Sequence, residues 1–329
     1  MTPHSGTTPD RTDSHSSIMD AILVMAYGSP GTPDDVGPYF THIRHGRTPS
    51  PEAVAGLQAR YARVGGVTPL VPHTDDVVAG LRTAFAAAGR RVPVYVGMKH
   101  WHPFIGSTVR RMHADGVRRA RAIVLAPHYS KMSIGQYRGY IDEALAELPE
   151  GMTIELVESW HRQPEFIALM ADLVRDGLAK FAEPDRTSVR VVLSAHSLPE
   201  RIRQWGDPYE EEVRESARAV ANRVGLPTWG WAWQSAGQTG EPWLGPDILD
   251  YLETLATEGV MRVLQVPIGF VSEHLEVLYD IDLEAKPKAT SLGMRLERTE
   301  LPNARPAFIA VLQAALRDQP VAVLGGGRP

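Results

Sequence analysis

The acidic side chains of one predicted helix, residues 272–286, have a spacing that suits cation binding. Glu276, Asp280 and Glu284 stand at positions i, i+4 and i+8, so they share one face of that helix. Like charges at this spacing repel one another, and the helix dipole disfavours Glu284 near the predicted C-terminal end. A divalent metal would offset both costs, so this face is a candidate metal site or metal path. The alternative is an ordinary solvated helix face.

A histidine at the end of a predicted strand is the second candidate. The segments Ile123–Ser130 and Val191–Ser197 are alike, because each is an apolar run that ends in a histidine followed by a hydroxyl residue. Ligands of parallel sheets bind beyond the carboxyl ends of the strands, which is where His196 would lie. A neutral imidazole there can hold a metal or accept a proton. A histidine that only caps the next helix is the alternative.

Arginines and hydroxyl groups gather in two segments of the first half of the chain. Arg44 precedes a glycine break, and Arg60, Tyr61 and Thr68 flank a glycine pair at 65–66. Arginine binds carboxylates through two parallel hydrogen bonds, and phenol and alcohol groups supply further donors. The pattern predicts a site for an acidic ligand. Solvent-exposed helix arginines beside a turn are the alternative.

A tyrosine, Tyr27, ends the first predicted strand just before Gly28. The turn lacks the G-x-G-x-x-G pattern, and Pro30 and Pro33 interrupt the start of the next helix, so we expect no nucleotide cofactor. The phenol of Tyr27 is placed to face a crevice, and a phenolate oxygen is a known type of haem-iron ligand. A half-buried strand tyrosine is the alternative.

The composition is typical of a soluble globular protein and restricts its metal chemistry. The chain has 329 residues, of which 43% are hydrophobic and 22% charged, and a formal net charge of -5 spread along its length, so we expect no nucleic-acid partner. There is no cysteine, which excludes disulfides and iron–sulfur clusters and leaves nitrogen and oxygen as metal ligands. No apolar run suits a transmembrane segment and residues 1–17 lack a signal-peptide core, so we expect a cytoplasmic protein.

The elements that must position these side chains alternate between short apolar runs and longer amphipathic ones. The predicted strands are Ala21–Ala26, Val92–Gly97, Ala122–Ala126, Ile154–Val157, Val189–Ser194, Trp229–Trp233 and Arg262–Pro267. The helical patterns between them predict an α/β protein whose parallel sheets are flanked by helices. We expect a disordered tail at 1–17, lobes at 18–150 and 151–304, a helix at 305–317 that packs on the first lobe, and a tail at 318–329.

Several of these segments resemble a known enzyme family. They include VMAYGSP (24–30), YFTHIRHGR (39–47), RYARVGGVTPL (60–70), SAHSLPERI (194–202), WQSAGQTGEPWLGPD (233–247) and PIGFVSEHLEVLYDID (267–282). Together they make the chain similar to the water-soluble bacterial ferrochelatases, which insert Fe2+ into a porphyrin. The resemblance implies a chelatase-like fold of two Rossmann-like lobes, with the active-site cleft between them.

The resemblance also implies roles for individual residues. His196 and Glu276 would face the porphyrin centre, deliver Fe2+ and accept pyrrole protons, and it stays open which of the two takes a proton. Asp280 and Glu284 would continue the metal path away from them. The residues implied to hold the porphyrin and its carboxylates are Arg44, Arg60, Tyr61, Thr68 and Tyr137.

Tyr27 indicates one branch of the family. Members that use coproporphyrin III resemble this chain in having a tyrosine before the glycine, and that tyrosine is an axial ligand of the product iron. We therefore expect Fe2+ and coproporphyrin III as substrates in haem biosynthesis, no nucleotide, no iron–sulfur cluster, a monomeric protein and a downstream haem-synthesis enzyme as recipient of the product.

Three other functions stay open. The first is a ferrochelatase that uses protoporphyrin IX. The second is a cobalt or nickel chelatase, although such relatives usually have a second histidine where this chain has Glu276. The third is a non-catalytic haem carrier, which would leave the acidic helix face without a purpose.

Overall fold

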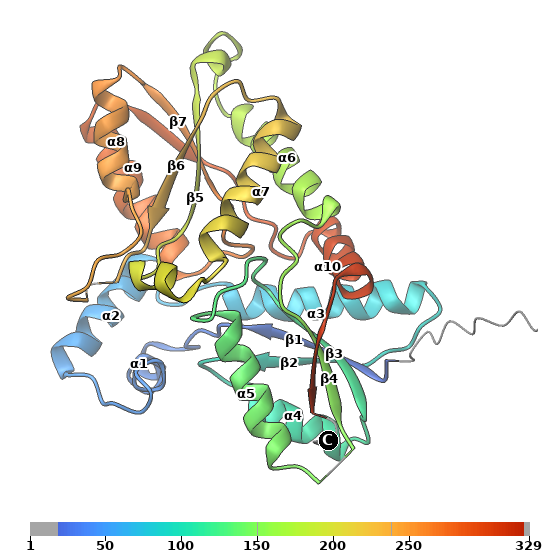
Figure 1. The fold of residues 1–329 in the computed structure, drawn as a ribbon. Helices are drawn as coiled ribbons and strands as arrows, with labels where there is room; N and C mark the ends of the chain where they lie inside the picture. Colours follow the sequence, from blue (N-terminus) through green and yellow to red (C-terminus); the bar gives the residue numbers. More distant parts are fainter. Residues whose placement is uncertain (1–18, 150, 238, 326–329) are drawn as a thin grey trace, which may run out of the picture.

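The computed structural model describes residues 19–149, 151–237 and 239–325. These residues form two α/β lobes, one above the other in Figure 1, each built around its own sheet. The tail expected at residues 1–17 lies outside the described residues. In the described part of the chain, no helix combines the length and the apolarity needed to cross a lipid bilayer.

The sheet of the first lobe has five strands in the order β2-β1-β3-β4-β9. Strands β1 to β4 pair in parallel, and β9 is antiparallel to β4. Their bounds are β1 (Ala21–Ala26), β2 (Val94–Met98), β3 (Arg119–Val124), β4 (Thr153–Val157) and β9 (Ala322–Gly325). Every residue of β1 is buried, as expected for a central strand that is covered on both faces.

The helices of this lobe lie on both faces of the sheet (Figure 1). Their bounds are η1 (Pro33–Asp35), α1 (Val36–Ile43), α2 (Pro51–Arg63), α3 (Leu70–Ala87), α4 (Ile105–Ala114), α5 (Ile134–Ala146) and α10 (Pro306–Asp318). Helix α3 contains Pro72 near its start, where proline is tolerated because the first turn leaves backbone N–H groups unpaired.

The sheet of the second lobe has four parallel strands in the order β6-β5-β7-β8. Their bounds are β5 (Arg190–His196), β6 (Trp229–Gln234), β7 (Arg262–Pro267) and β8 (Arg295–Arg298). The helices around it are α6 (Pro164–Leu178), η2 (Glu183–Ser188), η3 (Glu200–Trp205), α7 (Tyr209–Val224), α8 (Ile248–Thr257), the π-helix η4 (Val277–Ala285) and α9 (Lys286–Ser291).

The largest cluster of buried apolar side chains runs through both lobes. It contains Val24 of β1, Leu193 of β5 and Phe308 of α10. Helix α10 contacts α3 and β3 of the first lobe and α6 of the second, which is visible at the junction in Figure 1. The two lobes therefore share a core, and the ends of their strands are held in a defined relation.

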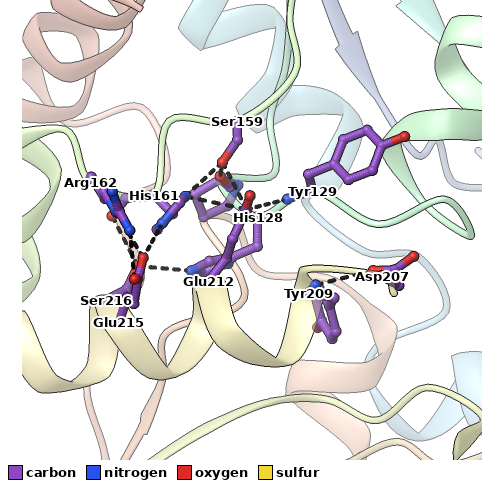
Figure 2. A network of polar contacts seen from close by, with 11 residues as sticks. His128, Tyr129, Ser159, His161, Arg162, Asp207, Tyr209, Glu212, Glu215 and Ser216 are labelled. Atoms are coloured by element: carbon purple, nitrogen blue, oxygen red, sulfur yellow. Dashed lines mark hydrogen bonds and ion pairs between the residues drawn. The ribbon is translucent and has the colours of Figure 1, made fainter. Parts of the chain in front are cut away.

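A polar network adds to this junction by joining the segments after β3 and β4 to α7 (Figure 2). His161 lies between two carboxylates of α7, with Nδ1 3.2 Å from Oε2 of Glu212 and Nε2 2.9 Å from Oε2 of Glu215. Arg162 also binds Glu215, and the backbone N–H of Tyr129 donates to Glu212 at 2.6 Å. These contacts fix α7 against the loops of the first lobe.

Three sequence-based expectations need correction. The lobe boundary at residue 150 is wrong, because β4 pairs in parallel with β3 and so belongs to the first sheet. The C-terminal tail is not wholly irregular, since β9 pairs with β4 and places Leu324 beside Ile154. The helix expected at 272–286 contains a nine-residue π-helix and continues through α9, so Glu284 is not at a helix end.

Candidate active site

An imidazole and a carboxylate from separate segments converge where the second lobe faces the first. His196 is the last residue of β5, and Glu276 immediately precedes η4. Nε2 of His196 lies 3.4 Å from Oε1 of Glu276, and the two side chains keep 27% and 38% of their surface exposed. The pair is therefore preformed and still accessible to a ligand.

The two groups stabilise each other's charge. Burial alone would lower the pKa of His196, but the neighbouring Glu276 carboxylate outweighs burial and raises it to about 9. Burial would likewise raise the pKa of Glu276, yet His196 lowers it well below its usual range. At neutral pH the pair is therefore an imidazolium and a carboxylate.

Backbone contacts set the orientation of the His196 ring. Its Nδ1 contacts the carbonyl oxygen of Ser197, so Nε2 is the nitrogen that faces Glu276. The phenol of Tyr209, the first residue of α7, donates to the backbone carbonyl of His196 at 3.0 Å. The polar network that holds α7 thus also supports the strand end that carries the imidazole.

The acidic helix face continues from Glu276 along η4. Asp280 accepts a hydrogen bond from Ser235 at 2.5 Å and pairs with Arg60 at 2.5 Å, while Glu284 is exposed. Burial is the main cause that raises the pKa of Asp280, to about 6, and the charge of Glu276 adds to it. π-helical turns are rare and frequently occur at functional sites, which fits their position here.

The face lines a cavity of about 670 Å³. Its wall includes Glu276, Asp280 and Glu284 from the second lobe and Phe40 and Arg60 from the first. Within the described ranges, no three His, Asp or Glu side chains converge in an arrangement that could hold a metal ion. The four expected metal ligands therefore form one close pair, His196 with Glu276, and two carboxylates further along the same face.

Helix α2 reaches across the cavity to η4. The guanidinium carbon of Arg60 lies 4.3 Å from the ring centroid of Tyr279, and that of Arg63 lies 4.8 Å from it. Arg63 also donates to the Tyr279 hydroxyl at 2.7 Å. Arg60, expected to hold a substrate carboxylate, is thus paired with Asp280 of the protein, although its Nε is buried without a partner.

On the first lobe, Tyr27 lies at the carboxyl end of β1 and is 42% exposed. Its ring packs against that of His100, with centroids 4.6 Å apart. The surrounding protein, together with the charge of Glu276, raises the pKa of the Tyr27 phenol above its usual range. The following turn requires glycine, because Gly28 has φ +90 and a Cβ there would lie 2.9 Å from Trp101.

The other predicted porphyrin contacts occupy different places around this strand end. Ser29 connects two of them, since its hydroxyl lies 2.9 Å from that of Thr68 and 3.4 Å from that of Tyr61. Tyr137 is buried, and the ammonium of Lys99 lies 5.3 Å from its ring centroid. Arg44 is exposed over the ring of Phe40, a cavity residue, at 5.7 Å.

Four contributors to this site did not stand out in the sequence. Ser235 follows β6 directly, so its place at a strand end was a usable signal. Lys99 follows β2 directly and had the same signal, whereas Ser29 and Tyr279 had none, because their importance comes from partners that are distant in the sequence. Ser235 also has a positive φ of 60, which is uncommon for a residue other than glycine.

Two largely parallel sheets, a cavity lined by residues of both lobes, and an imidazole–carboxylate pair at its edge define a two-lobed protein of the chelatase type. Solved structures with a similar fold include SirB from Bacillus subtilis with Fe3+, at a TM-score of 0.56 and 13% identity over 92% of this chain and 97% of that one. The sirohydrochlorin chelatase SirB from Bacillus subtilis subspecies spizizenii in complex with cobalt has a TM-score of 0.53, and the match covers 92% of this chain and 95% of that one. At such low identity these likenesses concern the fold.

The sequence comparison is more specific. The model of the family described as Ferrochelatase matches residues 19–319, and the chain belongs to this family. It is 47% identical over 304 residues to the ferrochelatase of Herpetosiphon aurantiacus, which covers 92% of this chain and 100% of that protein. It is 42% identical over 294 residues to the coproporphyrin III ferrochelatase of Bacillus subtilis strain 168, and this match covers 88% of this chain and 94% of that protein.

Proposed function

We propose that this protein is a coproporphyrin III ferrochelatase, which inserts Fe2+ into coproporphyrin III in haem biosynthesis. The observation that carries the proposal is the 3.4 Å separation of His196 Nε2 and Glu276 Oε1, beside a cavity that also exposes Asp280 and Glu284. Relatives named coproporphyrin III ferrochelatase, such as that of Bacillus subtilis, support the choice of porphyrin.

The acidic face supplies the route for the metal. Fe2+ enters past Glu284 and Asp280 and reaches Glu276 and His196. Nitrogen and carboxylate ligands bind Fe2+ firmly enough to replace water, and two of them leave positions free for porphyrin nitrogens. Because the pKa of His196 is about 9, Fe2+ displaces a proton when it binds the imidazole at neutral pH.

The same pair takes part in removing the pyrrole protons. Two ring nitrogens of the free porphyrin carry protons, and both leave as Fe2+ enters, so one Fe2+ and one free porphyrin give one Fe-porphyrin and two protons. Once Fe2+ has left, His196 and Glu276 can accept a proton at the porphyrin centre, where their separation of 3.4 Å keeps both within reach.

The first lobe binds the porphyrin by its carboxylates. Arg60 retains an unpartnered Nε, Arg44 is exposed over the ring of the cavity residue Phe40, and the hydroxyls of Tyr61 and Thr68 meet at Ser29. Binding energy from these peripheral contacts is available to bend the macrocycle, which turns nitrogen lone pairs toward the incoming metal. Coproporphyrin III has four carboxylates for these contacts, where protoporphyrin IX has two.

Tyr27 is the proposed ligand of the product iron on the face opposite the His196–Glu276 pair. Its exposed phenol at the end of β1 is the support for this role. We further propose a monomeric cytoplasmic enzyme without a nucleotide or iron–sulfur cofactor, which passes its product to a later enzyme of haem synthesis.

The test is the rate of anaerobic Fe2+ insertion into each free porphyrin, followed by the loss of the free-base absorption bands. The proposal predicts a higher kcat/KM for coproporphyrin III than for protoporphyrin IX. A preference for protoporphyrin IX would contradict the proposed substrate. The absence of insertion into either porphyrin would contradict the proposed function.

A further inference from the structure

A lysine that is almost wholly buried lies beside Tyr27. Lys99 directly follows β2, and its backbone N–H donates to the carbonyl of Ala26 at 2.9 Å, which aligns it with the end of β1. The residue is only 6% exposed. Its Nζ lies 5.4 Å from the ring centroid of Tyr27 and 5.3 Å from that of Tyr137, so it stands between two aromatic faces.

Among the described residues, Lys99 differs from every other lysine in having no polar partner for its ammonium. Lys286 and Lys288 form ion pairs with carboxylates, and Lys131 and Lys180 donate to backbone carbonyls. Burial without a compensating carboxylate therefore disfavours the charged form of Lys99.

An unpaired buried charge is costly, and the two flanking rings offset only part of that cost. A residue of this kind destabilises the ligand-free protein unless another group supplies the missing anion. In this position, next to two side chains of the proposed porphyrin site, a carboxylate of the bound ligand is the group placed to supply that anion.

We propose that Lys99 binds a carboxylate of the porphyrin and thereby favours acidic porphyrins over their neutral analogues. This inference rests on the proposed function and assigns one of its substrate contacts. Lysine suits the place because its ammonium is a compact charge, which stands between the rings of Tyr27 and Tyr137.

Metal-free porphyrin binding is the direct test, because it needs no turnover. Fluorescence titration compares the wild type with Lys99→Met for coproporphyrin III and for its tetramethyl ester. Loss of a charge-assisted contact is expected to weaken binding of the tetra-acid by about 10-fold or more and to leave binding of the ester nearly unchanged. Lys288→Met, a surface lysine paired with Glu253, is the matched control and should behave as the wild type.

A second readout separates this role from a structural one. Because Lys99→Met removes an unpaired buried charge, the thermal midpoint of the ligand-free protein should rise. If this variant folds poorly, Lys99→Gln provides the same binding comparison. Unchanged binding of coproporphyrin III by Lys99→Met would overturn the inference. An equal loss of affinity for the acid and for its ester would also overturn it, since Lys99 would then act on the Tyr27 phenol and not on a porphyrin carboxylate.

The outcome is distinguishable from a failure of the proposed function. If the wild type binds coproporphyrin III but inserts no iron, the function is wrong while the acid-specific loss in Lys99→Met still assigns the contact. If iron insertion proceeds and Lys99→Met binds both ligands as the wild type does, only the assignment of Lys99 fails.

Discussion

Nε2 of His196 and Oε1 of Glu276 lie 3.4 Å apart, one at the end of β5 and the other at the start of the π-helix η4. Each residue reverses the effect of burial on the other, since the pKa of His196 is raised and that of Glu276 is lowered. The site is therefore charged before any metal arrives, and Fe2+ has to compete with a proton at the imidazole.

Removing the carboxylate should expose this coupling. In Glu276→Gln, the largest influence left on the pKa of His196 is burial, opposed by the Ser197 carbonyl and the charge of Asp280, so this pKa is expected to fall from about 9 toward the ordinary value of 6.5. An NMR titration of the histidine ring protons measures this directly. A His196 pKa that stays near 9 in the variant would show that Glu276 is not the cause.

Ser235 is predicted to affect the metal rather than the porphyrin. Its hydroxyl donates to Asp280 at 2.5 Å, so Ser235→Ala should raise the pKa of Asp280 further above about 6 and leave less carboxylate at neutral pH. The expected result is a roughly 3- to 10-fold higher KM for Fe2+, which corresponds to the about 0.5–1.5 kcal/mol that a typical hydrogen bond contributes. The dissociation constant of coproporphyrin III should stay constant, and a change in that constant alone would refute the assignment.

Tyr27 is predicted to determine the electronic spectrum of the product complex. Replacing its phenol in Tyr27→Met removes the oxygen proposed to bind iron, so the absorption bands of the enzyme-bound Fe-porphyrin should shift. Tyr95→Phe, which removes a phenol that binds Asp115 far from this strand end, is the control and should leave the bands in place. Identical spectra for Tyr27→Met and the wild type would exclude Tyr27 as a ligand.

His161 is predicted to make stability depend on pH. Burial alone would lower its pKa, but the hydrogen bonds that its ring donates to Glu212 and Glu215 raise it above 6.5 (Figure 2). A raised folded-state pKa stabilises the protein fully below the unfolded value, and this contribution is lost as pH rises through the folded value. His161→Phe should therefore cost about 1–3 kcal/mol at mildly acid pH and less at alkaline pH.

The measurement is the thermal midpoint of the wild type and of His161→Phe at pH values from mildly acid to alkaline. The gap between the two proteins should narrow as pH rises. A gap of constant size would mean that the imidazole contributes by packing alone, and a gap that widens would mean that folding lowers the pKa of His161.

The sequence correctly predicts the strands that position the site residues. It fails to predict the edge strands of the sheets and the pairings between residues distant in the sequence. β1 and β7 have the predicted bounds, because central parallel strands are continuous apolar runs. Short edge strands such as β8 and β9 have too few residues and too little burial for a pattern. The lobe boundary failed because an apolar run does not reveal which sheet a strand joins, and β4 joins the first.

The same distinction between local patterns and long-range pairings applies to the site. The positions of Tyr27 and His196 at strand ends, and the shared face of Glu276, Asp280 and Glu284, follow from periodicity. The pairing of Arg60 with Asp280 does not, since it joins two lobes that only the folded chain brings together.

The most direct test of the central claim is iron insertion by His196→Ala beside its binding of metal-free coproporphyrin III. The variant loses the imidazole that faces Glu276, so we predict that porphyrin binding survives while insertion falls to the uncatalysed rate. Turnover at the wild-type rate in a His196→Ala protein that binds coproporphyrin III normally would contradict the account.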